Sequence, residues 1–330
     1  MKNFDPSAPA AEDSGLFGLP TDYESAKLAI LPAPWEVTTS YGAGTASAPQ
    51  AILKASHQVD LFNRLFAKAY ESGFFMMDYP QELFAKNVKM KKLAQTEEQL
   101  EQVNQACEEF NRHIYVQSQK VLRDGKFCAV LGGDHSTPFG LIQAIGEKYK
   151  RDYSILHFDA HHDLRQAYQG FTHSHASIFY NVMESSFAPK KLVQVGIRDF
   201  CEEEFLYARD NQRIHCYYDH DLAADLFKGK SWQHICDEIV SHLSDNVYVS
   251  VDIDGLSPDL CPNTGTPVPG GLSFQQFDFL LERLANKQKK IIGFDLVEVA
   301  PDPQNISEWD ANIGARVLFH LCGWLIKTQN

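Results

Sequence analysis

Apolar and polar residues follow two different rhythms along this chain. Short apolar runs rich in β-branched and aromatic residues predict strands at 28–31, 127–131, 153–158, 192–197, 214–218, 246–251 and 291–297. Longer segments with a helical repeat predict helices at 96–122, 137–149, 174–183, 232–243, 274–285 and 310–326. This alternation is typical of an α/β protein in which helices cross over between the strands of a mostly parallel sheet.

No linker interrupts this series of strands and helices. The chain has no tract rich in proline, serine and glycine and no internal repeat, so we expect a single domain over 26–330 after an N-terminal extension, 1–25. The segment 71–92 is the least regular part of the chain. Its four lysines predict a solvated face, with a subunit interface as the alternative: Lys86, Lys89, Lys91 and Lys92.

Acidic and histidine residues follow three of the predicted strands. The strand at 153–158 leads into Asp159-Ala-His-His-Asp163, whose alternate residues point to one side if the chain stays extended. The other two strands lead into Gly132-Gly-Asp-His-Ser136 and Asp252-Ile-Asp254. Ligands of open parallel sheets bind at the carboxyl ends of the strands. We therefore expect six side chains to meet at that edge: His135, Asp159, His161, Asp163, Asp252 and Asp254.

The composition excludes several classes of protein. The 330 residues are 44% hydrophobic and 22% charged, as in a soluble globular enzyme. A formal net charge of −13 argues against nucleic acid and membrane partners and suits a small cationic substrate. Seven cysteines, none at C-x-x-C spacing, favour a reducing, cytoplasmic location. The N-terminal residues lack the apolar core of a signal peptide, and no apolar run approaches the roughly 18 residues of a membrane helix.

The six residues at the strand ends form an oxygen-rich set of ligands. Two imidazoles with four carboxylates suit Mn²⁺ better than Zn²⁺, which prefers sulfur and nitrogen. Six ligands are too many for one ion here, so we expect two ions about 3.5–4 Å apart, with a bridging hydroxide as the nucleophile. The sequence contains no G-x-S-x-G elbow, P-loop or dinucleotide fingerprint that would indicate other chemistry.

These motifs resemble the three signature motifs of the ureohydrolase superfamily, which includes arginases and agmatinases. The likeness extends to Thr38-Thr-Ser-Tyr41, Ala48-Pro-Gln-Ala-Ile52, Gly265-Thr-Pro267 and Asp295-Leu-Val-Glu298-Val-Ala-Pro301, and covers the chain from about residue 28 onward. The resemblance implies an open three-layer α/β/α fold, two Mn²⁺ ions per subunit, and assembly into homo-trimers or hexamers. It also implies that the hydroxide attacks a guanidinium carbon, which releases urea and an amine.

The resemblance also implies a role for each residue of the site. His135 and Asp163 would be terminal ligands of one ion, and His161 and Asp254 would be terminal ligands of the other. Asp159 and Asp252 would bridge both ions. Asp163 would in addition take the remaining proton of the hydroxide. Glu298 would hold the guanidinium through a planar, bidentate pair. His175 would shuttle protons near the mouth of the site, with His173 as the second candidate.

Three further polar residues lie beside the expected ligands. His162 has the opposite strand parity from the ligands, and His157 lies deeper in its strand, so we interpret both as structural. Asp134 is expected to fix its loop rather than to bind metal.

Residues around Arg165 indicate which kind of substrate tail the site would accept. Arginases usually carry asparagine at the Arg165 position and an acidic residue at the Cys201 position, so neither arginase contact to the amino-acid end is present. The string from Asp163 to Gly170, with Arg165 and Tyr168 as candidate tail contacts, followed by Ser174-His-Ala176, looks most like the agmatinase branch. The expected reaction converts agmatine to putrescine and urea.

Other functions stay open. Formimidoylglutamases also carry the D-L-R string, and Arg165 could bind a glutamate carboxylate, but they generally lack a histidine at the His175 position. After formimidoylglutamase, the next alternatives are arginase, guanidinobutyrase and then other guanidino-acid hydrolase activities. A metal-stabilised oligomer without catalysis is a different class of answer. A third class is a zinc deacetylase of similar fold, which would use a single metal ion. The pair of carboxylates at Asp252 and Asp254 argues against this class.

Overall fold

The chain folds around one eight-stranded sheet, as a computed structural model that describes residues 4–11 and 14–329 shows. The strand order is β2-β1-β3-β8-β7-β4-β5-β6, and every neighbouring pair is parallel. The strands are β1 (Leu28–Ala33), β2 (Phe74–Met76), β3 (Phe127–Gly132), β4 (Ser154–Phe158), β5 (Lys191–Ile197), β6 (Ile214–Tyr218), β7 (Asn246–Asp252) and β8 (Lys290–Val297).

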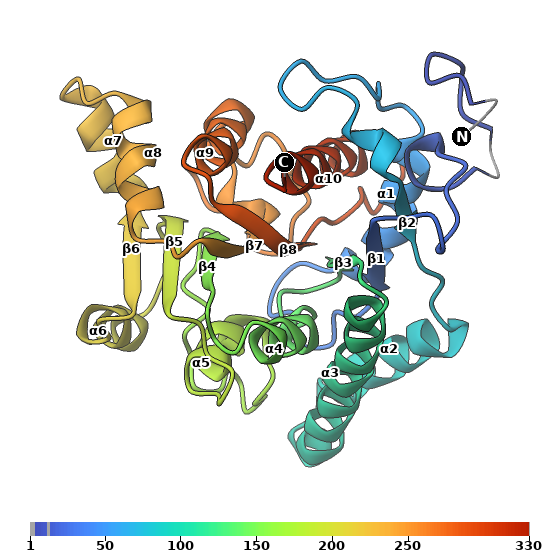
Figure 1. The fold of residues 1–330 in the computed structure, drawn as a ribbon. Coiled ribbons are helices and arrows are strands. Elements are labelled where there is room, and N and C mark those ends of the chain that lie inside the picture. Colours follow the sequence, from blue (N-terminus) through green and yellow to red (C-terminus); the bar gives the residue numbers. More distant parts are fainter. Residues whose placement is uncertain (1–3, 12–13, 330) are drawn as a thin grey trace.

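Helices cover both faces of this sheet, which makes the fold a three-layer α/β/α sandwich (Figure 1). One face carries α1 (Ala48–Ser56), α7 (Asp219–Phe227), α8 (Trp232–Ser241), α9 (Phe274–Asn286) and α10 (Trp309–Lys327). The other face carries α2 (Gln81–Leu93), α3 (Leu100–Arg123), α4 (Phe139–Lys148), α5 (Ile178–Met183) and α6 (Glu202–Asp210). A separate apolar core fills the space between the sheet and each helix layer.

Helix α3 illustrates how the sequence pattern sets these layers. Its residues Val103, Cys107, Phe110 and Ile114 recur at helical spacing and are all buried against the sheet side. The neighbouring helix α4 comes very close, because a Cβ atom on Gly140 would lie 2.3 Å from the backbone oxygen of Asn111. The apolar stripe thus fixes which face of α3 turns inward.

The seven predicted strands are all present, each within two residues of its expected bounds. The expectation that 71–92 is irregular is wrong, since this segment contains the edge strand β2 and most of α2. Lys89 and Lys92 are exposed as expected, but Lys91 reaches inward to Glu36, with 2.7 Å between Nζ and Oε1. Helices α1, α6 and α7 were also not predicted.

The residues before β1 pack against the domain. Leu16, Phe17 and Leu19 are buried in the core shared with α1 and α10. The Phe17 ring meets Phe319 edge to face, with 5.1 Å between the ring centroids. Part of the segment before residue 26 therefore contributes to the apolar core.

Candidate metal centre and its pocket

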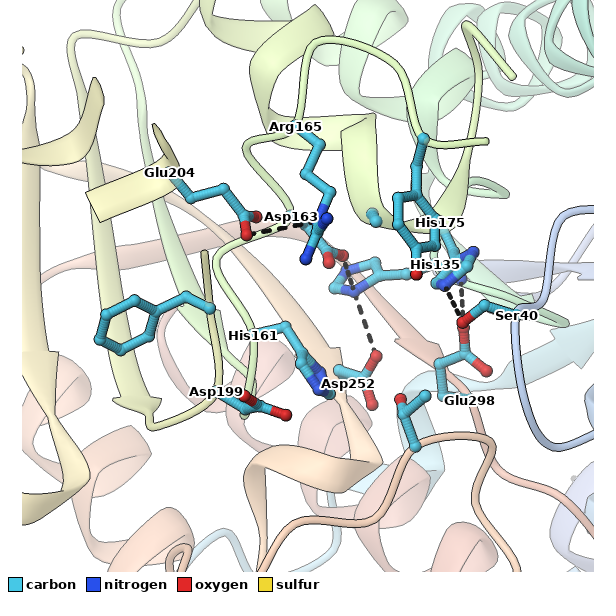
Figure 2. A pocket seen from close by; sticks show the side chains of 14 residues that line it. Ser40, His135, His161, Asp163, Arg165, His175, Asp199, Glu204, Asp252 and Glu298 are labelled. Atoms are coloured by element: carbon cyan, nitrogen blue, oxygen red, sulfur yellow. Dashed lines mark hydrogen bonds and ion pairs between the residues drawn. The ribbon is translucent and has the colours of Figure 1, made fainter. Parts of the chain in front are cut away.

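The candidate site lies at the carboxyl ends of the four central strands. Strands β3, β8, β7 and β4 are consecutive neighbours in the sheet. Parallel strands end at the same edge, so the segments that follow them converge there. His135 follows β3, Glu298 follows β8, Asp252 ends β7, and His161 follows β4 (Figure 2).

His135 lies among three carboxylates. Its Nδ1 is 3.0 Å from Oδ2 of Asp159, 3.0 Å from Oδ2 of Asp163 and 3.2 Å from Oδ2 of Asp252. All four residues are buried, yet this Nδ1 makes no hydrogen bond. Carboxylate oxygens that converge in a dry interior need a cation to offset their repulsion. The arrangement fits a divalent ion with nitrogen and oxygen ligands.

His161 forms a second group beside the first. Its Nδ1 is 3.4 Å from Oδ1 of Asp159 and 3.2 Å from Oδ2 of Asp254. Asp159 therefore turns one oxygen to His135 and the other to His161. This is the position expected of a bridging ligand, although its binding of metal stays a prediction.

The ionisable groups of the site show an excess of negative charge. Burial, together with Asp254 and Asp159, raises the pKa of Asp252 well above its ordinary value. Burial and Asp159 raise the pKa of Asp163 to about 7. Burial opposes protonation of His161, but Asp254 and Asp159 outweigh it and raise its pKa to about 12. Two divalent ions would supply the positive charge that four carboxylates require.

Two glycines allow the strand-end segments to approach one another. A Cβ atom on Gly133 would lie 1.8 Å from the backbone oxygen of Trp35, and one on Gly255 would lie 2.5 Å from the backbone nitrogen of Asp159. Gly133 also accepts a hydrogen bond from the backbone N–H of Glu298, at 2.9 Å. Glycine is required at both positions because no side chain fits there.

Two of the site residues have unusual backbone conformations. Asp163 has φ of 54° and Glu298 has φ of 60°, both in the left-handed region. Such residues cost roughly 1–3 kcal/mol each and occur where surrounding contacts fix them, often at functional sites. The strain is consistent with a functional position for both carboxylates.

Two polar neighbours of the expected ligands are hydrogen-bonded within the site. Asp134 accepts hydrogen bonds from the Ser136 backbone N–H, at 3.0 Å, and from the Thr38 hydroxyl, at 3.2 Å, so it fixes its loop. His157 belongs by proximity to a possible ligand group with His135 and Asp159. Its Nε2, however, is hydrogen-bonded to Oδ2 of Asp159 at 2.8 Å, so the ring helps to orient that carboxylate.

A pocket of about 170 Å³ opens over the two ligand groups (Figure 2). It is lined by eight of the residues that the sequence singled out: His135, His161, Asp163, Arg165, Tyr168, His175, Asp252 and Glu298. Asp159 and Asp254 are buried and do not line it. The structure thus brings four of the six predicted ligands to one cavity, together with the residues predicted as shuttle, guanidinium partner and tail contacts.

Glu298 presents an unpaired oxygen to this pocket. Its Oε1 accepts a hydrogen bond from the backbone N–H of His135, at 2.9 Å, while Oε2 is buried and has no hydrogen-bond partner. Burial and the nearby Asp134 raise the pKa of Glu298 well above its ordinary value. A cationic donor in the pocket would satisfy this oxygen.

His175 lines the pocket, whereas His173 packs against Phe139 and does not. The backbone N–H of His175 donates to Oγ1 of Thr38 at 3.1 Å. Burial and the charge of His161 lower the pKa of His175 to about 4. The ring is therefore neutral near pH 7, with one nitrogen as a donor and the other as an acceptor.

Arg165 is held at the mouth of the pocket by two contacts. Its Nε lies 3.4 Å from Oε2 of the buried Glu204, and its guanidinium carbon lies 4.5 Å from the centroid of the Tyr168 ring. In the part of the chain that the structure describes, its Nη atoms make no hydrogen bond. They remain free to meet a ligand.

Sequence reasoning gave no role to five residues of the pocket, although Ser40 and Thr266 lie in strings that resemble the family: Ser40, Asp199, Phe200, Glu204 and Thr266. Asp199 and Phe200 follow β5, so the strand-end rule that found the ligands would also have found them. Glu204 lies in α6 and gave no signal, since only the fold brings it to Arg165.

No helix in the described part of the chain is both long and apolar enough to span a membrane.

Comparison of the sequence with known families shows a match to the arginase family over residues 26–323. An N(1)-aminopropylagmatine ureohydrolase from Thermus thermophilus is 34% identical over 304 residues, which are 92% of each chain. An agmatinase from Halalkalibacterium halodurans is 29% identical over 92% of this chain and 94% of its own.

Solved structures share the fold. The agmatine ureohydrolase of Thermoplasma volcanium has a TM-score of 0.72 at 24% identity, covering 99% of this chain and 96% of its own. Proclavaminate amidino hydrolase from Streptomyces clavuligerus has a TM-score of 0.75 at 21% identity, covering 98% and 100%. At these identities the likeness concerns the three-layer architecture.

Proposed function

The chain belongs to the arginase family, and on this premise we propose that it hydrolyses agmatine to putrescine and urea with two Mn²⁺ ions. The observation that carries the proposal is the unpaired Oε2 of Glu298, buried in the pocket above the two ligand groups. Relatives at 34% and 29% identity named as an aminopropylagmatine ureohydrolase and an agmatinase support a guanidino substrate with an amine tail.

Two groups of residues would hold the metal ions. His135 and Asp163 would hold one ion and His161 and Asp254 the other, with Asp159 and Asp252 contributing to both. When bound, the ions supply a water of lowered pKa and polarise the guanidinium. Four carboxylates and two imidazoles favour Mn²⁺ over Zn²⁺ by their oxygen content.

Glu298 would orient the guanidinium group. Its Oε2 is the acceptor for a substrate N–H, while the bond from His135 N–H to Oε1 holds the carboxylate in place. A charged hydrogen bond in a buried site is short and strong, so it fixes the guanidinium carbon over the ligand groups. The Glu298 carboxylate also compensates the cation that enters the pocket.

Two residues would manage protons. Asp163 belongs to the His135 ligand group and also lines the pocket, so its carboxylate is placed to accept a proton from the attacking water. His175 faces the same cavity as a neutral ring and can pass a proton between solvent and the leaving amine. Ser40 is 3.4 Å from Nε2 of His175 and would help to orient it.

The mouth of the pocket suits an amine tail. Glu204 offsets the charge of Arg165 at 3.4 Å, so the exposed carboxylate of Asp199 leaves this part of the pocket negative. Tyr168 and Phe200 add aromatic faces that attract cations. Agmatine and longer agmatine derivatives share this tail chemistry.

Arg165 supports a second candidate function. Its free Nη atoms at the mouth of the pocket could bind a carboxylate through two hydrogen bonds, which would suit formimidoylglutamate or a guanidino acid. Glu204 weighs against this reading because it already offsets the charge of Arg165.

The test is hydrolysis by the Mn²⁺-loaded protein of agmatine, N(1)-aminopropylagmatine, arginine and guanidinobutyrate, followed by urea release. Formimidoylglutamate is followed in parallel by formamide release. A kcat/KM at least tenfold higher for an amine-tailed substrate supports the proposal, and a preference for a carboxylate-tailed substrate assigns Arg165 as a carboxylate clamp. We keep the trimeric or hexameric assembly and the cytoplasmic location as predictions.

A further inference from the structure

We propose that Ser250, Asp295 and Tyr248 form a buried relay that orients His135 and sets the affinity of one of the two metal ions. The inference rests on the proposed function, because it presumes that His135 holds a metal ion. The three residues touch no substrate, so they act as positioning residues.

The relay is a chain of short contacts beneath the pocket. Nε2 of His135 lies 3.0 Å from Oγ of Ser250. Ser250 Oγ donates to Oδ1 of Asp295 at 2.9 Å, and the Tyr248 hydroxyl donates to Oδ2 of Asp295 at 2.7 Å. Each of these residues is at most 1% exposed, so no solvent water competes for these bonds.

The donors and acceptors of the relay have one consistent arrangement. A carboxylate only accepts, so both hydroxyl hydrogens point to Asp295. The Ser250 oxygen is then left to accept, and the imidazole of His135 must donate its Nε2–H. Nδ1 is therefore the ring nitrogen left for a cation, and this is the atom that faces three carboxylates without a hydrogen bond.

The sheet itself holds the relay in place. Ser250 and Asp295 are register partners on β7 and β8, so their side chains lie on one face of the sheet next to each other. Gly293, the register partner of Tyr248, lets β8 pack closely on β3, since a Cβ atom there would lie 3.0 Å from the backbone oxygen of Cys128. Three strands thus fix one imidazole.

The second histidine ligand has no such support. The side chain of His161 is 24% exposed and, within the described residues, its Nε2 has no hydrogen-bond partner. Loss of the relay should therefore weaken the ion held by His135 and spare the ion held by His161. This asymmetry separates a positioning role from a general structural one.

The variant that tests the relay is Ser250→Ala. Without the Ser250 oxygen, the Nε2–H of His135 is buried without an acceptor, and the ring gains by moving its proton to Nδ1, where it competes with the metal. Loss of such a partner typically lowers metal affinity about 10- to 100-fold. We expect this loss for one of the two Mn²⁺ ions, measured as the two-site binding isotherm by electron paramagnetic resonance of free Mn²⁺.

The matched control is Ser154→Ala. Ser154 is also fully buried on a strand and bonds Oγ of Ser244 at 2.7 Å, but it lies at the opposite end of β4 from the site. This control should lower the Tm of the metal-free protein and leave both Mn²⁺ affinities unchanged. Asp295→Asn is the second relay variant, with a weaker effect in the same direction, and carries the test if Ser250→Ala fails to fold.

The outcomes separate the relay from the proposed function. Unchanged affinities in both relay variants, or equal weakening of both ions, would overturn the relay while leaving the enzyme proposal intact. A parent protein that binds no Mn²⁺ and releases no urea would overturn the proposed function and the relay together. Activity at limiting and saturating Mn²⁺ gives a second readout, since only a metal-positioning role predicts recovery at saturation.

Discussion

Replacing Glu298 with glutamine tests the central contact of the proposed mechanism. The amide keeps the size of the side chain and can still accept the hydrogen bond of the His135 backbone N–H at 2.9 Å. It removes the charge and offers an N–H in place of the unpaired Oε2, so a donor would face the donors of the guanidinium. The variant therefore changes the substrate contact with little change in shape.

The magnitude follows from burial. Glu298 is 3% exposed, so solvent cannot replace the lost contact. Removing one partner of a buried, hydrogen-bonded charge pair costs about 2–5 kcal/mol. At about 1.4 kcal/mol for each factor of ten, kcat/KM for agmatine should fall by about 30-fold to several thousand-fold.

The assay is urea release from agmatine at saturating Mn²⁺, with Mn²⁺ binding measured on the same preparations. Mn²⁺ binding should stay within about threefold of the parent, because Glu298 is not among the expected ligands. Asp278→Asn is the control, since it also turns a buried carboxylate into an amide but bonds Trp324 and His320 outside the pocket. A kcat/KM of Glu298→Gln within threefold of the parent would refute the assigned role.

Three further predictions concern the metal, the pH dependence and the backbone. Asp252→Ala should reduce bound Mn²⁺ to at most one ion per chain and abolish urea release, which metal analysis and activity can check together. The pKa of about 4 for His175 means that the unfolded chain binds its proton first as pH falls from 6.5 to 4, so stability drops in that range. In metal-free His175→Asn, the slope of unfolding free energy against pH should be shallower there by at most about 1.4 kcal/mol per pH unit, because only one proton is involved. Gly133→Ala should cost more than about 3 kcal/mol in denaturant unfolding because its Cβ would strike the Trp35 carbonyl, whereas Gly125→Ala, with open space and φ of +77°, should cost about 1 kcal/mol.

The sequence alone determined the strands and the positions at their ends. Runs such as 153–158 and 291–297 consist mainly of aliphatic and aromatic residues, and both faces of a central parallel strand are buried, so the pattern is strong. Because parallel strands end at one edge, the order of the strands and the residues that follow them is enough to predict that those residues lie together. This is why His135, His161 and Asp252 were found.

Weaker local patterns left other elements unseen. The edge strand β2 has three residues, and α2 shows a thin apolar stripe, so neither gave a periodic signal. The short helix α6 was missed for the same reason, and with it Glu204, which meets Arg165 only in the folded chain. Burial and tertiary packing, rather than local preference, decide these elements.

The tertiary structure alone decided how the site is supported. Ser250 and Asp295 are 45 residues apart and meet because β7 and β8 are neighbours in a given register. The unpaired Oε2 of Glu298 likewise depends on which donors the fold brings near it. A sequence shows which side chains can bind a metal or a proton, but partners depend on distance and burial, which exist only once the strands are assembled.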